Sequence, residues 1–90
     1  MSKFNVELQN AIALALKMTN ERLEKVPNYI IYQAIHHELT MIQTALDTNT
    51  KLAPEVKRKM NFGYFAAREI HNDDEYAEAL HKAYSLSLRW

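Results

Sequence analysis

The 90-residue chain balances eleven basic residues against eleven acidic ones, contains no cysteine, and has one Gly and two Pro. The balanced charge argues against a nucleic-acid-binding protein, because such proteins usually present a net basic face. The lack of Cys excludes disulfides, thiol catalysis and zinc sites of the Cys type. So few Gly and Pro residues favour long helices with few connections over a β fold, which needs many turns.

Length and hydropathy set the expected organisation. Ninety residues are expected to form one domain, residues 1–90. The N-terminal stretch MSKFNVELQN has no apolar run long enough for a signal peptide, and no stretch could span a bilayer. The sequence therefore predicts a cytoplasmic protein that has no membrane partner.

Apolar residues at helical spacing predict a first helix over residues 4–25. Pro27 should end it, because the residue before a proline avoids the α conformation. A second helix is expected over residues 29–47, with Asn28 as its N-cap. The very short connection between them predicts that the two helices are antiparallel neighbours.

The second helix is expected to be the central one. Ile35 and Leu39 belong to an apolar stripe with steps of four and three, and a second stripe through Ile30, Ala34, Met41 and Ala45 lies beside it. Two adjacent stripes predict a helix that is buried on a wide face.

A third helix is expected over residues 54–70, after a polar linker at residues 47–53. Pro54 suits its first position, where the missing N–H costs nothing. Gly63 lies inside this helix and should cost about 1 kcal/mol relative to Ala. The expected compensation is the close approach of a neighbouring helix backbone.

A fourth helix is expected over residues 73–89. Asn72 followed three residues later by Glu75 resembles a capping box at its start. The fold class is therefore all-α, a four-helix bundle-like domain made of two antiparallel helical hairpins.

No complete catalytic or metal-binding set is present. Glu78 and His81 form Glu-x-x-His, but a di-iron bundle needs a second copy and two further Glu from facing helices. His36 and His37 diverge by about 100° on a helix and cannot easily share one metal. With no phosphate-binding loop or nucleophile elbow either, the sequence predicts no metal, no cofactor and no enzyme. A carboxylate-bridged metal bundle is the third-ranked alternative.

Aromatic and acidic residues gather near the turn between the third and fourth helices. The expected partner-binding residues are Tyr64, Arg68, Glu69, Asp73, Asp74 and Glu75. Tyr and Arg carry much of the energy of protein interfaces, although small bundles also use aromatics as core filler and acids as helix caps. The alternative surface is the end of the second helix that carries Tyr29, Tyr32, His36 and His37.

Four short patterns, each present once, follow one another in an order and spacing that are similar to those of a known protein family. They are Arg22-Leu23 with Pro27-x-Tyr29, then Gly63-x-x-Ala66 before Arg68-Glu69, then the acidic turn at residues 73–75, and last Ala79-Leu80-x-x-Ala83-Tyr84. They lie within longer similar runs, residues 21–46 and 62–89, and the run AIALAL at residues 11–16 is similar as well. The similarity therefore covers nearly the whole chain, apart from the linker at residues 47–53. In these features the sequence resembles a family of small helical immunity proteins, which protect bacteria from type VI secretion effectors that are NAD(P)+ glycohydrolases.

The resemblance implies an antitoxin. Such a protein would bind a cognate toxin domain in the cytosol and cover its active site during interbacterial competition. The alternative is a helical adaptor or dimerisation module with no toxin partner, and the sequence leaves a homodimer open.

Overall fold

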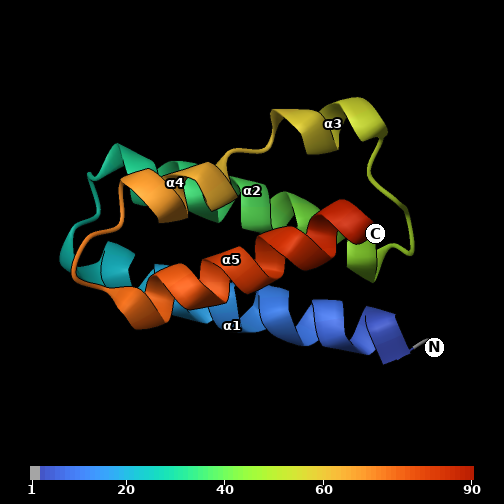
Figure 1. Cartoon of the computed structure of the whole chain (residues 1–90), viewed down its shortest axis with the longest axis horizontal. Helices are drawn as coiled ribbons and strands as arrows, with labels where there is room; N and C mark the ends of the chain where they lie inside the picture. The colour runs from blue at the N-terminus through green and yellow to red at the C-terminus, as the bar shows by residue number, and fades with distance from the viewer. Residues whose placement is uncertain (1–2) are drawn as a thin grey trace.

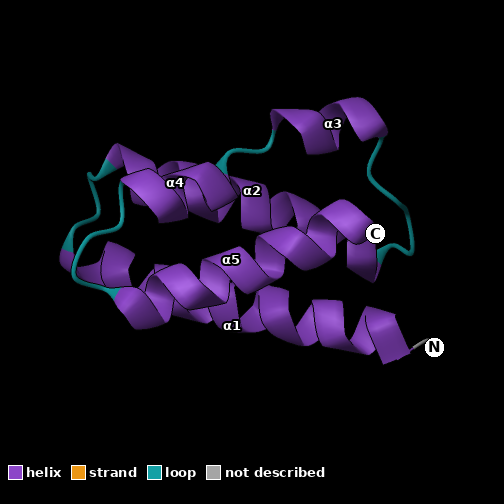
Figure 2. Cartoon of the chain, viewed as in Figure 1, coloured by secondary structure: helices purple, strands orange, loops and turns teal. Residues whose placement is uncertain are grey.

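The computed structural model describes residues 3–90, and this part of the chain is all-α, with no strand (Figure 2). The helices are α1 (Lys3–Lys25), α2 (Ile30–Asp47), α3 (Pro54–Lys59), α4 (Phe62–Arg68) and α5 (Asp74–Arg89). The predicted fold class is confirmed. Among the described residues, no helix has an apolar stretch long enough to cross a membrane.

Two antiparallel hairpins make the bundle, α1 with α2 and α4 with α5 (Figure 1). The contacts form a ring in which α1 packs on α2 and α5, and α4 packs on α5 and α2. No helix is therefore central, and the prediction of α2 as the central helix is wrong. One reason is that α2 buries the middle of one apolar stripe fully but the second stripe only at Ala45. Ile35 and Leu39 have no exposed surface, whereas Ile30 is largely exposed and Ala34 and Met41 are only half-buried. No residue of α3 is buried, and its Val56 only lines an open hollow beside Met41, so α3 leaves the second stripe partly uncovered.

The predicted third helix is in fact two short helices separated at Met60 and Asn61. Met60 has an extended backbone, with φ −71° and ψ 137°, and its side chain is buried. Glu38 of α2 stabilises the new start, because its Oε1 accepts hydrogen bonds from the backbone N–H groups of Asn61 (2.7 Å) and Phe62 (2.9 Å). A carboxylate from another helix therefore satisfies two of the free donors at the start of α4. Burial raises the pKa of Glu38, and these two hydrogen bonds partly offset that shift.

Both predicted caps are wrong. The N-cap residue of α2 is Tyr29, one position after Asn28, and its side chain makes no capping hydrogen bond. The N-cap residue of α5 is Asp73, and Asn72 lies before it with a left-handed φ of 57°. Asn tolerates this conformation better than most residues. Asn72 therefore shapes the turn, and the capping box with Glu75 does not form.

The close approach predicted at Gly63 is present, but its partner is a side chain and not a backbone. A Cβ atom on Gly63 would lie less than 3.0 Å from three atoms of the Tyr84 ring on α5. The same ring meets Phe62 edge-on, with 5.1 Å between the ring centroids. Gly63 thus allows α4 to pack tightly on α5.

Candidate partner-binding surface

The α1–α2 and α4–α5 connections lie together at one end of the molecule, away from both chain termini (Figure 1). We call this end, formed by residues 19–32 and 64–76, the loop end. Five of the six predicted binding residues lie on α4, at its C-terminus or in the first turn of α5, and their side chains are exposed. The sixth, Asp73, is half-buried.

Arg22 and Asp73 join the two connections. Nε of Arg22 donates to Oδ2 of Asp73 at 2.8 Å, and Nη2 donates to Oδ1 at 3.0 Å. Nη1 of Arg22 donates to the carbonyl oxygen of Met18 at 2.9 Å, which fixes the guanidinium against α1. Paired hydrogen bonds of this kind are among the stronger polar contacts in proteins. They hold the start of α5 against the end of α1, across 51 residues of sequence.

The pair shifts the titration of both groups. The hydrogen bonds and the positive charge of Arg22 lower the pKa of Asp73, with a smaller contribution from the backbone N–H of Tyr76. Partial burial opposes this shift without cancelling it. The same contact raises the pKa of Arg22. Asp73 is therefore engaged within the protein, and it serves to position the turn.

Tyr76 extends this contact into the core. Its ring is fully buried, and the guanidinium carbon of Arg22 lies 4.4 Å from the ring centroid. Its hydroxyl lies 2.7 Å from the hydroxyl of Thr19, which itself donates to the carbonyl oxygen of Ala15 at 2.7 Å. Because Thr19 has a single hydroxyl proton, Tyr76 must be the donor between the two. Burial raises the pKa of Tyr76 to about 12, so this donor stays protonated at neutral pH.

Three tyrosines continue from the core to the surface. Tyr76 meets Tyr32 edge-on at a centroid distance of 5.8 Å, and Tyr32 meets Tyr29 edge-on at 4.8 Å. Aromatic pairs prefer this geometry. Tyr29 and Tyr32, which the sequence suggested only as an alternative surface, are thus connected to the predicted surface through Tyr76 and Arg22.

The remaining predicted residues form a solvent-facing strip. Tyr64 is 54% exposed, and the guanidinium carbon of Arg68 lies 5.2 Å from its ring centroid. Glu69, Asp74 and Glu75 are exposed in and beside the turn that follows. A cation stacked on an aromatic ring, beside free carboxylates, suits the polar part of a protein interface.

Sequence reasoning missed two exposed apolar residues at the loop end, Val26 and Ile30, which lie close in sequence to Tyr29 of the alternative surface. The available signal was their position on both sides of Pro27 and Asn28. In a short connection no helical period can turn such residues inward. Periodicity also assigned Ile30 to a buried stripe, although it is the first residue of α2 and nothing covers it.

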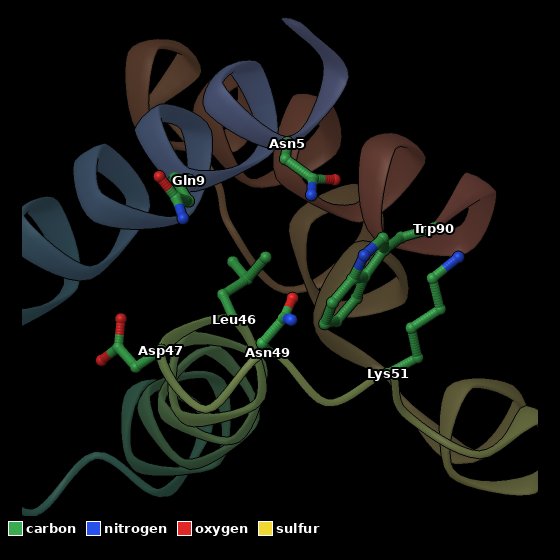
Figure 3. A pocket seen from close by; sticks show the side chains of 7 residues that line it. All are labelled: Asn5, Gln9, Leu46, Asp47, Asn49, Lys51 and Trp90. Atoms are coloured by element: carbon green, nitrogen blue, oxygen red, sulfur yellow. The ribbon is translucent and has the colours of Figure 1, made fainter. Parts of the chain in front are cut away.

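A separate hollow lies at the opposite end, between α1, the end of α2, the following linker and the C-terminus (Figure 3). It measures about 620 Å³ and is lined by Asn5, Gln9, Leu46, Asp47, Asn49, Lys51 and Trp90. Its polar groups are mostly amides, which are poor nucleophiles. Within residues 3–90, no three side chains of the His, Cys, Asp or Glu type are grouped so that they could hold a metal ion.

The pairing of Arg22 with Asp73 predicts a loss of stability in acid. Because the pKa of Asp73 is lowered in the folded protein, the stabilisation is fully present above about pH 5, where Asp is ionised in the unfolded chain as well. It should disappear as the pH falls below about 4 and Asp73 takes up a proton. Because both side chains keep some contact with solvent, we expect a contribution of about 1 kcal/mol at neutral pH.

The matched variant is Asp73→Asn, which keeps the size and removes the charge. Urea unfolding between pH 7 and pH 2.5 measures the free energy of unfolding of both proteins. Wild type should be the more stable at neutral pH, and the difference should disappear in acid. A difference in the free energy of unfolding that stays constant over this pH range would contradict the assigned role of the pair.

Searches of curated proteins and of solved structures each found no match to this chain. A family model, Tsi6, matches residues 7–88, which is nearly the whole sequence and includes all of the loop end. The resemblance found in the sequence is therefore confirmed. The chain belongs to the Tsi6 family, a family of type VI secretion immunity proteins directed against NAD(P)+ glycohydrolase effectors.

Proposed function

We propose that residues 1–90 act as one immunity domain that binds a cognate toxin domain in the cytosol and covers its active site. The match to the immunity family over residues 7–88 carries this proposal. The partner is a protein, and neither nucleic acid nor a membrane is involved. The chain inhibits by occupying the toxin, with no metal, cofactor or catalytic activity of its own.

We place the contact at the loop end, with Tyr64, Arg68, Glu69, Asp74 and Glu75 facing the toxin and Asp73 holding the turn in place. NAD(P)+ carries phosphates, so a glycohydrolase cleft should be basic enough to attract an anion. Exposed carboxylates would enter the same electrostatic field, which speeds association and excludes partners of the wrong charge. The contact between Arg22 and Asp73 supports the placement, because a preorganised surface loses less entropy on binding.

The direct experiment is co-expression with the toxin domain encoded by the neighbouring gene. We expect the two chains to co-purify in equal amounts, and we expect the immunity protein to stop consumption of NAD+ by the purified toxin. Separate elution of the two chains, with toxin activity unchanged, would overturn the proposal.

Charge reversal tests the position of the surface. The double variant Glu69→Lys with Asp74→Lys should slow association with the toxin by about tenfold at low salt, and the difference should shrink as salt screens the charges. A stopped-flow or biosensor measurement at two salt concentrations gives this rate. Protection of cells that express the toxin should weaken in parallel.

A matched control for this pair is available at the other end of the molecule. Asp47 ends α2 and Glu55 lies in the first turn of α3, and both are exposed. Asp47→Lys with Glu55→Lys makes the same change in net charge far from the loop end, so its association rate should stay closer to that of wild type. If Glu69→Lys with Asp74→Lys alters only thermal stability, by about 1 kcal/mol through the helix dipole of α5, the binding surface lies elsewhere.

A further inference from the structure

Val26, Tyr29 and Ile30, which we call the apolar tip, are the exposed apolar residues of the α1–α2 connection. They are 45%, 38% and 71% exposed. The other large apolar residues that are exposed within residues 3–90, namely Val6, Leu14, Tyr64 and Leu88, are not clustered in this way along the chain. Scattered apolar residues on a surface are ordinary, whereas a cluster marks a contact site.

Hydrogen bonds and ring contacts restrain the apolar tip. The backbone N–H of Tyr29 donates to the carbonyl oxygen of Val26 at 3.1 Å. The side-chain amide of Gln33 donates to the backbone carbonyl oxygen of Pro27 at 2.7 Å. The Tyr29 ring rests edge-on against Tyr32, which in turn contacts the buried ring of Tyr76. Because these contacts restrain the segment, less entropy should be lost when a partner binds it.

The end of the molecule that carries the apolar tip is also acidic. Glu21 and Glu24, on the last turns of α1, line a shallow hollow with Arg22, Lys25 and Asp73. Arg22 pairs with Asp73 and also lies 4.0 Å from Glu21. The hollow thus holds three acids against two cations, a small excess of negative charge. Glu69, Asp74 and Glu75 add negative charge at the same end. The complementary surface is therefore an apolar depression with a basic rim.

Resting on the function proposed above, we infer that the apolar tip is the central anchor of the contact with the toxin, with Ile30 and Tyr29 filling an apolar depression beside its basic cleft. The carboxylates then form the polar rim that usually surrounds such an anchor. A second copy of this chain fits the surface poorly. In a twofold contact each patch meets itself, so the acidic rims would face one another and repel.

The variant Ile30→Glu tests the anchor. Ile30 is the first residue of α2, where a carboxylate suits the helix dipole, so the fold should be kept. Because an anchor residue contributes a large share of the binding energy, the substitution should raise the Kd for the toxin domain encoded by the neighbouring gene at least about 30-fold. The matched control is Leu14→Glu, a residue 51% exposed on α1, for which we expect a change in Kd within about threefold.

The sign of the effect separates an apolar anchor from an electrostatic surface. Ile30→Glu adds negative charge to an acidic end, so a contact based on charge alone would form as fast as in wild type or faster. Unchanged or tighter binding by Ile30→Glu would overturn the anchor, and so would an equal loss for Leu14→Glu. Analytical ultracentrifugation adds a further outcome: a wild-type dimer that Ile30→Glu dissociates, with toxin affinity unchanged, would assign the tip to a second copy and overturn the inference.

The measurement on wild type distinguishes a failure of this inference from a failure of the proposed function. If wild type binds and inhibits the toxin while Ile30→Glu behaves like wild type, only the anchor fails. If wild type itself does not bind the toxin, the proposed function fails, and the inference fails with it.

Discussion

Replacing Leu39 by Ala is expected to lower the free energy of unfolding by about 2–5 kcal/mol, the usual range for a buried Leu. Leu39 has no exposed surface and belongs to the core that α1, α2, α4 and α5 share. The loss combines the transfer energy of the missing methyl groups with the energy of the cavity left behind. Ile35, one turn earlier and also fully buried, should behave in the same way.

For a domain of ordinary stability, about 5–15 kcal/mol, such a loss is a large part of the total. Urea unfolding followed by circular dichroism gives the free energy, and an unchanged m-value would show that the two-state analysis still applies. The control is Leu14→Ala, the same substitution at an exposed helix position, which should stay within about 0.5 kcal/mol of wild type. A loss of less than about 1 kcal/mol for Leu39→Ala would contradict the core described above.

Local pattern predicted the long helices well. The expected ranges 4–25, 29–47 and 73–89 each agree to within a residue at either end with α1, α2 and α5, because these segments bury one apolar stripe and end at Pro or polar residues. The expected helix over residues 54–70 failed at Met60 and Asn61. The carboxylate of Glu38 meets the backbone there from 23 residues away, and no local pattern reports a contact of that range.

The candidate surface was predicted only in part, for the same physical reason. The acids of the α4–α5 turn and Tyr64 are exposed, as a surface requires. Asp73 is different, since its carboxylate is held by Arg22 from 51 residues away, and a helix-capping role accounted for it adequately in the sequence. The exposure of Ile30 in the apolar tip was not predicted, because Ile30 fits the helical period of a buried stripe. The packing of α1, and not the period, decides which stripe of α2 is covered.

The substitution Gly63→Ala should destabilise the protein by about 1–3 kcal/mol, the usual cost of overpacking a well-filled contact. This reverses the ordinary result, because Ala is better than Gly by about 1 kcal/mol in a helix interior, and part of that advantage applies at Gly63, the second residue of α4. The cause is the Tyr84 ring, three of whose atoms would lie within 3.0 Å of the new Cβ. That ring also packs on Phe62, which is fully buried, so it cannot move away from α4 without losing core contacts.

A double-mutant cycle isolates this contact. Tyr84→Ala alone should cost stability, because the half-buried ring packs against the core. In that background, however, Gly63→Ala meets no ring, and its effect should change sign to a gain of about 0.5–1 kcal/mol from helix propensity. Thermal and urea unfolding of the four proteins would measure the coupling. If Gly63→Ala stabilises the protein even with Tyr84 present, the ring moves aside at little cost, and the close packing of α4 on α5 does not depend on glycine.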